Sequence, residues 1–326
     1  MARAAAQATE GLRCLCRAVG RMIASKTRRP RSARSRVDRR RRGVGLLLAT
    51  PLMTVVALLV VVPLLEAGYY SMTSWNGISV HWIGLQSYAQ LFLHTFGIGQ
   101  ILQNNAAVVV SIPVGLVLAL VAAFFTATQA AGSRLFRSLV FLPVALSWVV
   151  VGIVFSDFLA TSGGLDTLLR TVGLGFMAQD WLGNTHTAML ALLATFTWGM
   201  FGINTVIFMT GLAAIPTELV DAARVDGAST PQTLRYVILP VMRRFLQLAF
   251  IVTMISGFSG LFALIFVMTA GGPGFATTTL EFEIYQEAFA LGNFGAAAAF
   301  GIVLFAIMVV LTLTVGRLGG REQGAA

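Results

Sequence analysis

The chain has 326 residues, of which 57% are hydrophobic and only 11% are charged, and its mean hydropathy is +0.82. Soluble globular domains carry about 25% charged residues, so the composition excludes an ordinary soluble enzyme. The net charge of +10 is uneven, because residues 1–42 hold 14 Lys and Arg against two acidic residues, whereas residues 43–326 hold 9 against 11. We therefore expect a basic, disordered cytoplasmic tail near anionic lipid, with no role in nucleic-acid binding, followed by a nearly neutral membrane domain.

Six stretches of the chain are long and apolar enough to cross a bilayer as helices, which takes about 20 residues each. They lie at 44–65, 106–128, 138–160, 187–214, 245–270 and 295–315. The sequence therefore predicts an all-α, polytopic membrane protein with six transmembrane helices.

The distribution of arginine predicts the orientation, because positively charged loops near span ends are retained in the cytoplasm. The connections after the first and fifth spans contain no Lys or Arg, and the connection after the third contains only Arg170. The second and fourth connections and the C-terminal segment are basic, with Arg134, Arg137, Arg224, Arg235, Arg243, Arg244, Arg317 and Arg321. Both termini are thus predicted to be cytoplasmic.

The sequence contains no recognisable constellation for catalysis or for binding a metal or cofactor. Asp157 is the one acidic residue inside a predicted span and lies near its outer end, which disfavours a proton relay. The three histidines stand apart from one another, and Cys14 and Cys16 lie in the tail, so no metal-ligand spacing emerges. The only lysine, Lys26, lacks the glycine-rich loop of phosphate-binding ATPases. We predict no catalytic residue, no metal site and no cofactor held by this chain.

The connection at 215–244 is predicted to form a helix, a turn and a second helix on the cytoplasmic side. Gly227 tolerates the left-handed conformation on which helices end. Ser229 or Thr230 can cap the second helix, and Pro240 is predicted to end or kink it before the fifth span. A structured element of this kind is more than a linker between two spans.

This connection resembles the EAA loop of ABC importer permeases, and the chain resembles most the sugar-type permeases of the maltose and glycerol-3-phosphate kind. The likeness rests on Glu218-Leu219-Val220-Asp221-Ala222-Ala223, Asp226-Gly227-Ala228 and Ile238-Leu239-Pro240. It extends to Ser71-Met72-Thr73-Ser74-Trp75, Trp82-Ile83-Gly84-Leu85, Phe141-Leu142-Pro143 and Gly271-Gly272-Pro273-Gly274. Two positions depart from the pattern: Asp221 replaces the glutamate that names the motif, and Leu234 stands where the family often has phenylalanine.

The resemblance implies a subunit of an importer in a bacterial inner membrane. This chain would pair with a second permease subunit as a heterodimer, and an extracytoplasmic solute-binding protein would deliver a carbohydrate. A separate dimer of ATP-binding cassette ATPases would hold ATP and Mg²⁺. The residues implied to couple to it are Glu218, Asp221, Ala222, Ala223, Asp226, Gly227, Ala228, Leu239 and Pro240.

Polar and aromatic residues near the middle of the fourth and fifth spans are candidates for the substrate path: Trp198, Asn204, Ser256, Phe258 and Ser259. Hydroxyl and aromatic groups suit a neutral sugar. The same residue types also occur where helices simply pack together in membranes, so both interpretations stay open. An anionic substrate also stays open, although no cationic residue lies inside the spans.

Two other classes of protein fit the composition. A stand-alone facilitator or channel would need few charges but would have no use for a structured cytoplasmic loop. A membrane-embedded enzyme is disfavoured by the missing catalytic constellation.

Overall fold

The computed structural model describes residues 49–93, 97–127 and 138–320, with side chains through residue 317. Helices dominate this part of the chain, and its single β contact is an antiparallel bridge between Thr73 and Trp82. Within the described residues, 49–65 belong to one unit and those from Glu66 onward to another. The predicted tail at 1–42 lies outside the described residues.

Five of the described helices are long and apolar enough to span a membrane, and the count is six when one bent pair is taken as a single span. The first is Ala49–Tyr70, whose last turns form α3 (Val62–Tyr70). Three of the others are α5 (Ile98–Ala127), α9 (Ala188–Ala213) and α15 (Phe294–Gly320). These helices agree with the predicted first, second, fourth and sixth spans, although α5 begins eight residues earlier than the predicted 106.

The predicted third span, 138–160, is broken rather than continuous. One segment, Ser138–Ala145, ends in a 3-10 turn (η2, Leu142–Ala145), and a second helix, α7, runs from Trp148 to Leu159 at 111° to it. Pro143 supplies no backbone N–H to a continuing helix, and Ser147 has an extended backbone. The Ser147 side chain accepts a hydrogen bond from the Val150 N–H at 3.4 Å and so starts a new helix there.

The predicted fifth span, 245–270, has different bounds in the structure. The helix that crosses the membrane runs from Thr230 to Ser259 and includes α12 (Leu239–Ser259), after which α13 (Leu261–Met268) begins. The span therefore starts inside the connection predicted at 215–244. Pro240 does not end this helix, because a wide π turn (η4, Leu234–Ile238) precedes it and accommodates the missing N–H.

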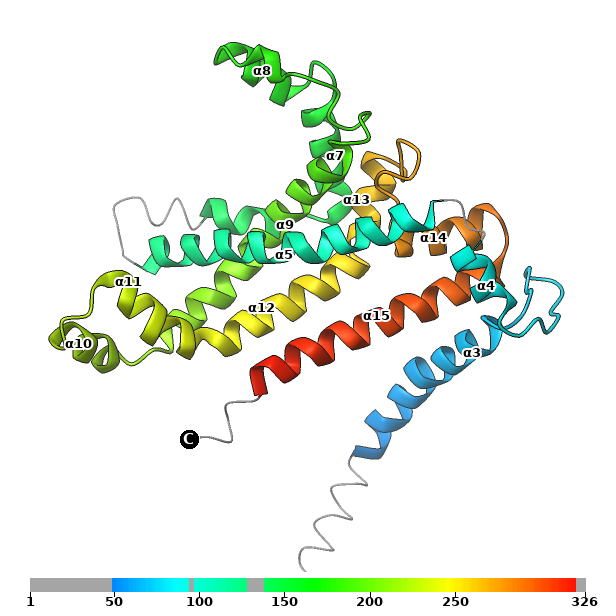
Figure 1. Cartoon of the computed structure of the whole chain (residues 1–326), viewed down its shortest axis with the longest axis horizontal. Coiled ribbons are helices and arrows are strands. Elements are labelled where there is room, and N and C mark those ends of the chain that lie inside the picture. Colours follow the sequence, from blue (N-terminus) through cyan, green and yellow to red (C-terminus); the bar gives the residue numbers. More distant parts are fainter. Residues whose placement is uncertain (1–48, 94–96, 128–137, 321–326) are drawn as a thin grey trace, which may run out of the picture. The chain divides into compact units, whose positions relative to one another are not determined.

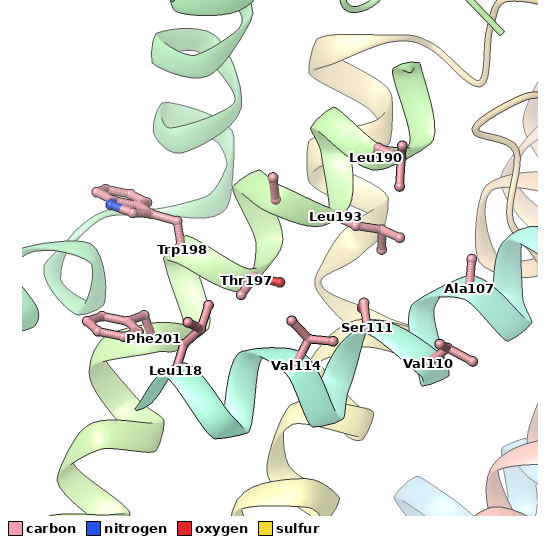
Figure 2. A pocket seen from close by; sticks show the side chains of 11 residues that line it. Ala107, Val110, Ser111, Val114, Leu118, Leu190, Leu193, Thr197, Trp198 and Phe201 are labelled. Carbon is pink, nitrogen blue, oxygen red and sulfur yellow. The ribbon is translucent and has the colours of Figure 1, made fainter. Parts of the chain in front are cut away.

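Helices α5, α9 and α12 form the centre of the bundle (Figure 1). A Cβ added to Gly115 on α5 would lie 3.1 Å from Thr197 on α9, whereas Gly211 at the far end of α9 faces Phe245 near the start of α12. Asn204, earlier on α9, bonds to Thr253, later on α12, so these two helices run antiparallel. Along the cavity between α5 and α9, Ala107 lies toward Leu190 and Leu118 toward Phe201, so these two helices run in the same direction (Figure 2). These directions agree with the alternation that the arginine distribution predicts.

The connections at the end of the bundle opposite 215–244 are held in place by side-chain hydrogen bonds. The Asn104 side chain on α5 donates hydrogen bonds to the carbonyls of Phe275 and Thr278, both at 2.8 Å. Beyond α7, Trp181 Nε1 donates to Asp166 Oδ1 at 2.9 Å, which closes the loop around α8 (Gly164–Thr171). Helix α14 (Leu280–Tyr285) and a π turn (η5, Gln286–Ala290) lead into α15.

Candidate functional site

The predicted helix–turn–helix at 215–244, called the coupling loop below, is present. Helix α10 (Thr217–Val225) ends at a turn in which Gly227 has a φ of +80°. The Ala228 N–H donates to the Ala223 carbonyl at 2.9 Å, and the Gly227 N–H donates to the Arg224 carbonyl at 3.0 Å. This pair of bonds is a Schellman motif, which explains why a glycine stands at its left-handed position.

A capping box formed by Ser229 and Gln232 closes the N-terminus of the second helix of the coupling loop. Gln232 Oε1 accepts hydrogen bonds from the Ser229 N–H at 2.7 Å and from the Ser229 hydroxyl at 2.9 Å. Helix α11 (Thr230–Thr233) then continues through the π turn into the fifth span without a break in the helix. The coupling loop is therefore rigidly joined to a membrane helix.

The predicted coupling residues divide into an exposed set and a half-buried set. Glu218, Asp221, Ala222, Asp226 and Gly227 are exposed, whereas Ala223 and Ala228 are half-buried. Asp221 and Arg224 form an ion pair at 3.5 Å with both side chains about 70% exposed (68% and 72%), so it contributes little stability. Leu239 and Pro240 lie beyond the π turn, at the start of α12. The exposed part of the predicted set thus consists mainly of acidic and small residues, beside the exposed Val225.

The predicted substrate-path residues do not share one cavity. Asn204 is buried and its Oδ1 accepts a hydrogen bond from Thr253 at 3.0 Å, and Phe258 is buried in the core. Ser259 is exposed, and its hydroxyl donates to the carbonyl of Ile255 at 2.7 Å. Trp198 and Ser256 each line a different cavity.

The cavity beside Trp198 is large and apolar, with a volume of about 660 Å³ between α5 and α9 (Figure 2). Its lining residues are Ala107, Val110, Ser111, Val114, Leu118, Leu190, Leu193, Ala194, Thr197, Trp198 and Phe201. The Ser111 hydroxyl already donates to the Val108 carbonyl at 2.7 Å. A surface of this kind offers few hydrogen bonds to a sugar, and it suits lipid or a neighbouring helix.

The cavity beside Ser256 is smaller, about 190 Å³, and lies at the break in the third span. Trp148, the first residue of α7, lines it and stacks on Phe196 with centroids 5.5 Å apart. Among the described residues, neither the Trp148 indole N–H nor the Ser256 hydroxyl has a hydrogen-bond partner. Both groups are therefore available to a ligand.

Sequence reasoning missed Trp148 as a candidate, although glycines on the facing helices carried a signal. A Cβ at Gly199 would overlap the Trp148 ring, and a Cβ at Gly260 would lie 3.1 Å from Trp148 Nε1. Likewise, a Cβ at Gly202 would overlap the Val140 carbonyl. Glycine at these positions allows the broken span to approach closely.

Buried carboxylates lie in the connection that leads to the sixth span. Both carboxylate oxygens of Glu281 are buried and have no hydrogen-bond partner in the described part of the chain. Burial raises the pKa of Glu281 to about 7, and the nearby Thr279 hydroxyl and the main chain of Glu281 offset only part of this. The pKa of Glu283 is also raised, first by burial and then by Glu287. No group of three metal-ligating side chains occurs among the described residues.

A bundle of helices long enough to span a membrane, with a structured helix–turn–helix between two of them, defines the membrane subunit of a transport system. The chain belongs to the family of binding-protein-dependent transport system inner membrane components, which matches residues 111–321. The resemblance predicted from the coupling loop is thereby confirmed.

Known relatives match nearly the whole chain. A probable ABC transporter permease protein of Pyrococcus horikoshii is 31% identical over 283 residues, which cover 85% of this chain and 97% of that protein. The diacetylchitobiose uptake system permease protein of Streptomyces coelicolor is 30% identical over 298 residues, which cover 85% and 83% of the two chains. A bacterial ABC transporter involved in the import of the acidic polysaccharide alginate has the same fold, with a TM-score of 0.73, 18% identity and coverage of 88% of this chain and 99% of its own.

Proposed function

We propose that this chain is one of two membrane subunits, forming a heterodimer, of an ATP-driven carbohydrate importer in a bacterial inner membrane. Its termini lie in the cytoplasm, and an extracytoplasmic solute-binding protein delivers the substrate to the opposite side. ATP and Mg²⁺ are held by a separate ATPase dimer, and this chain holds no cofactor. A stand-alone facilitator is not favoured, because it would have no use for the coupling loop.

The observation that carries the proposal is the continuity of the coupling loop with the fifth span. Helix α10 connects α9 to the helix that runs from Thr230 to Ser259. A force applied to α10 by an ATPase therefore reaches the membrane through one helix, which continues past Pro240 by way of the π turn. Coupling of this kind requires a stiff element that can occupy two arrangements.

Contact with the ATPase is tested by crosslinking from Val225, which is 87% exposed at the end of α10. A single cysteine is placed at Val225 in a chain whose Cys14 and Cys16 are replaced, and native membranes are treated with a short thiol-to-amine crosslinker. We expect one product that contains an ATPase with a phosphate-binding loop. The matched control is a cysteine at Ile78, which is 96% exposed in the connection after the first span. Capture of the ATPase from both positions, or from neither, would contradict the proposal.

The cavity at the broken third span is the best candidate for contact with substrate in this chain. Trp148 and Ser256 offer two free polar groups beside an aromatic surface, which suits a neutral, hydroxylated ligand. No charged residue lines this cavity, so an anionic substrate is less well matched. Its 190 Å³ is below the roughly 300–1,000 Å³ of complete ligand pockets, which fits one side of a path completed by the second permease subunit.

Uptake by membrane vesicles that carry the whole importer tests this assignment. The substrates are maltose, diacetylchitobiose and glycerol 3-phosphate, each radiolabelled. We expect uptake of a neutral sugar, with a KM that rises about tenfold in Ser256→Ala combined with Trp148→Phe. Ser259→Ala is the matched control, because Ser259 lines neither of these two cavities. An unchanged KM in the double variant, or uptake of glycerol 3-phosphate alone, would refute the substrate assignment.

A further inference from the structure

A third cavity, of about 360 Å³, lies between the coupling loop and the cytoplasmic end of α5. This volume is within the roughly 300–1,000 Å³ range of small-molecule sites. The walls are Phe124 from α5 and Val220, Arg224, Ala228, Thr230, Thr233, Leu234 and Ile238 from the coupling loop. Figure 1 shows α10 and α11 near this end of α5. The proposed substrate path does not use this cavity, and of the predicted coupling residues only Ala228 lines it.

The chemistry of the lining is that of an amphiphile site with an anionic head. Phe124, Leu234 and Ile238 form apolar walls, and among the described residues Arg224 is the only charged one in the lining. The exposed pair with Asp221 holds Arg224 only weakly, so its guanidinium can bind another anion. The Thr230 hydroxyl has no hydrogen-bond partner among the described residues and adds a donor beside it.

The depth of the cavity matches the headgroup layer of the cytoplasmic leaflet. The helix Thr230–Ser259 has 30 residues, and at 1.5 Å per residue it is about 45 Å long. The hydrocarbon core of a bilayer is only about 30 Å thick, so roughly ten residues lie outside it. The charged residues of this helix, Arg235, Arg243 and Arg244, all lie in its first half, so the excess falls at that end. Residues 230–239 there include the cavity-lining Thr230, Leu234 and Ile238. This placement assumes the cytoplasmic orientation given under the proposed function.

We propose that this cavity binds one anionic phospholipid of the cytoplasmic leaflet. Arg224 and Thr230 bind its phosphate, and one acyl chain lies against Phe124, Leu234 and Ile238. Basic pockets between transmembrane helices on the cytoplasmic side bind anionic headgroups in this way. The lipid fills the space between the coupling loop and α5, so it supports the loop on the side that faces the bilayer.

Native mass spectrometry of the full-length chain, released from nanodiscs of phosphatidylcholine with increasing phosphatidylglycerol, measures how much phosphatidylglycerol each chain retains. We expect Arg224→Gln to weaken retention roughly fivefold, since one arginine near a membrane surface contributes about a fivefold effect. Val220→Phe should reduce retention by filling the cavity. The matched control is Arg235→Gln, because Arg235 lies in the same loop but packs over the Tyr236 ring, 5.7 Å from its centroid, and does not line the cavity.

Several results would overturn the proposal. Equal losses in Arg224→Gln and Arg235→Gln would mean that the loop attracts anionic lipid only through its general charge. Equal retention of phosphatidylcholine and phosphatidylglycerol by the wild type would mean that no headgroup is recognised. A photo-crosslinker at Thr233 that captures the ATPase or another segment of this chain, rather than lipid, would identify a different occupant. The assay needs neither ATPase nor substrate, so its failure leaves the importer assignment standing, and a failed Val225 crosslink leaves lipid binding standing.

Discussion

Asparagine in place of Gly227 should be tolerated better than alanine, although asparagine is the larger side chain. Gly227 has a φ of +80°, and a Cβ placed there would meet no atom within 4 Å. The penalty of a substitution is therefore conformational and not steric within this chain. An ordinary residue costs about 1–2 kcal/mol in the left-handed region, whereas asparagine enters it more readily.

A penalty of 1–2 kcal/mol corresponds to a factor of about 5–30 in an equilibrium constant. Gly227→Ala should weaken docking of the ATPase by that factor, because the turn holds α10 in the geometry that docks. Gly227→Asn should weaken docking less, and the β-branched Gly227→Val should weaken it more. Gly227→Asp has the shape of the asparagine variant but adds a negative charge at the docking surface, so it should leave the protein inserted in the membrane but uncoupled from ATP hydrolysis.

The assay compares ATPase retained on membranes with substrate-dependent ATP hydrolysis for the three neutral variants, at matched levels of inserted protein. The order asparagine, alanine, valine, from mildest to most severe, supports the conformational argument. If asparagine is more damaging than alanine, the glycine is needed to make room for the partner, and the reasoning from the turn is refuted.

Three further predictions concern the bundle. Gly202→Ala should reduce the amount of inserted, folded protein, because the added Cβ would overlap the Val140 carbonyl. Overpacking of this kind costs about 1–3 kcal/mol of folding stability. Thermal denaturation in detergent measures the loss. Thr253→Val should lower stability by about 0.5–2 kcal/mol in the same assay, because it leaves the buried Asn204 Oδ1 without its donor; an unchanged midpoint would contradict this. Glu281 lies outside the spans with its pKa raised from 4.5 to about 7, so folding stability should be greatest below about pH 4.5 and fall as the pH rises to about 7, by on the order of 3 kcal/mol. Glu281→Gln should reduce this pH dependence of the unfolding midpoint and leave only the part that the raised pKa values of Glu283 and Glu287 supply.

Much of the architecture could be predicted from the order of apolar and charged residues along the chain. Long apolar stretches fix where helices must cross, and the placement of arginine fixes the expected orientation, because both follow from the cost of moving polar groups through lipid. The coupling loop was also predictable, since Gly227 and Ser229 are residues that helix ends require. These features depend on local chemistry, which the sequence states directly.

The details of the substrate path could not be predicted in the same way. Asn204 and Ser256 are both polar residues in mid-span, yet only the structure distinguishes a side chain with a buried partner from one that faces a cavity. Pro240 was expected to end or kink a helix, yet the helix continues through it, because a π turn just before it accommodates the missing N–H. Such outcomes depend on packing between distant segments, which a single sequence does not state.

The interruption of the third span has a mechanical consequence. Trp148, where α7 begins, lies beside Gly260, where α12 gives way to α13. Helices α7 and α13 pack on each other through Gly152, which faces Val267. The two breaks in the backbone therefore lie side by side, and α7 and α13 form one packed unit beyond them. Tilting this unit against the rest of the bundle would break few backbone hydrogen bonds, so a movement that begins at the coupling loop would be taken up most easily at this joint.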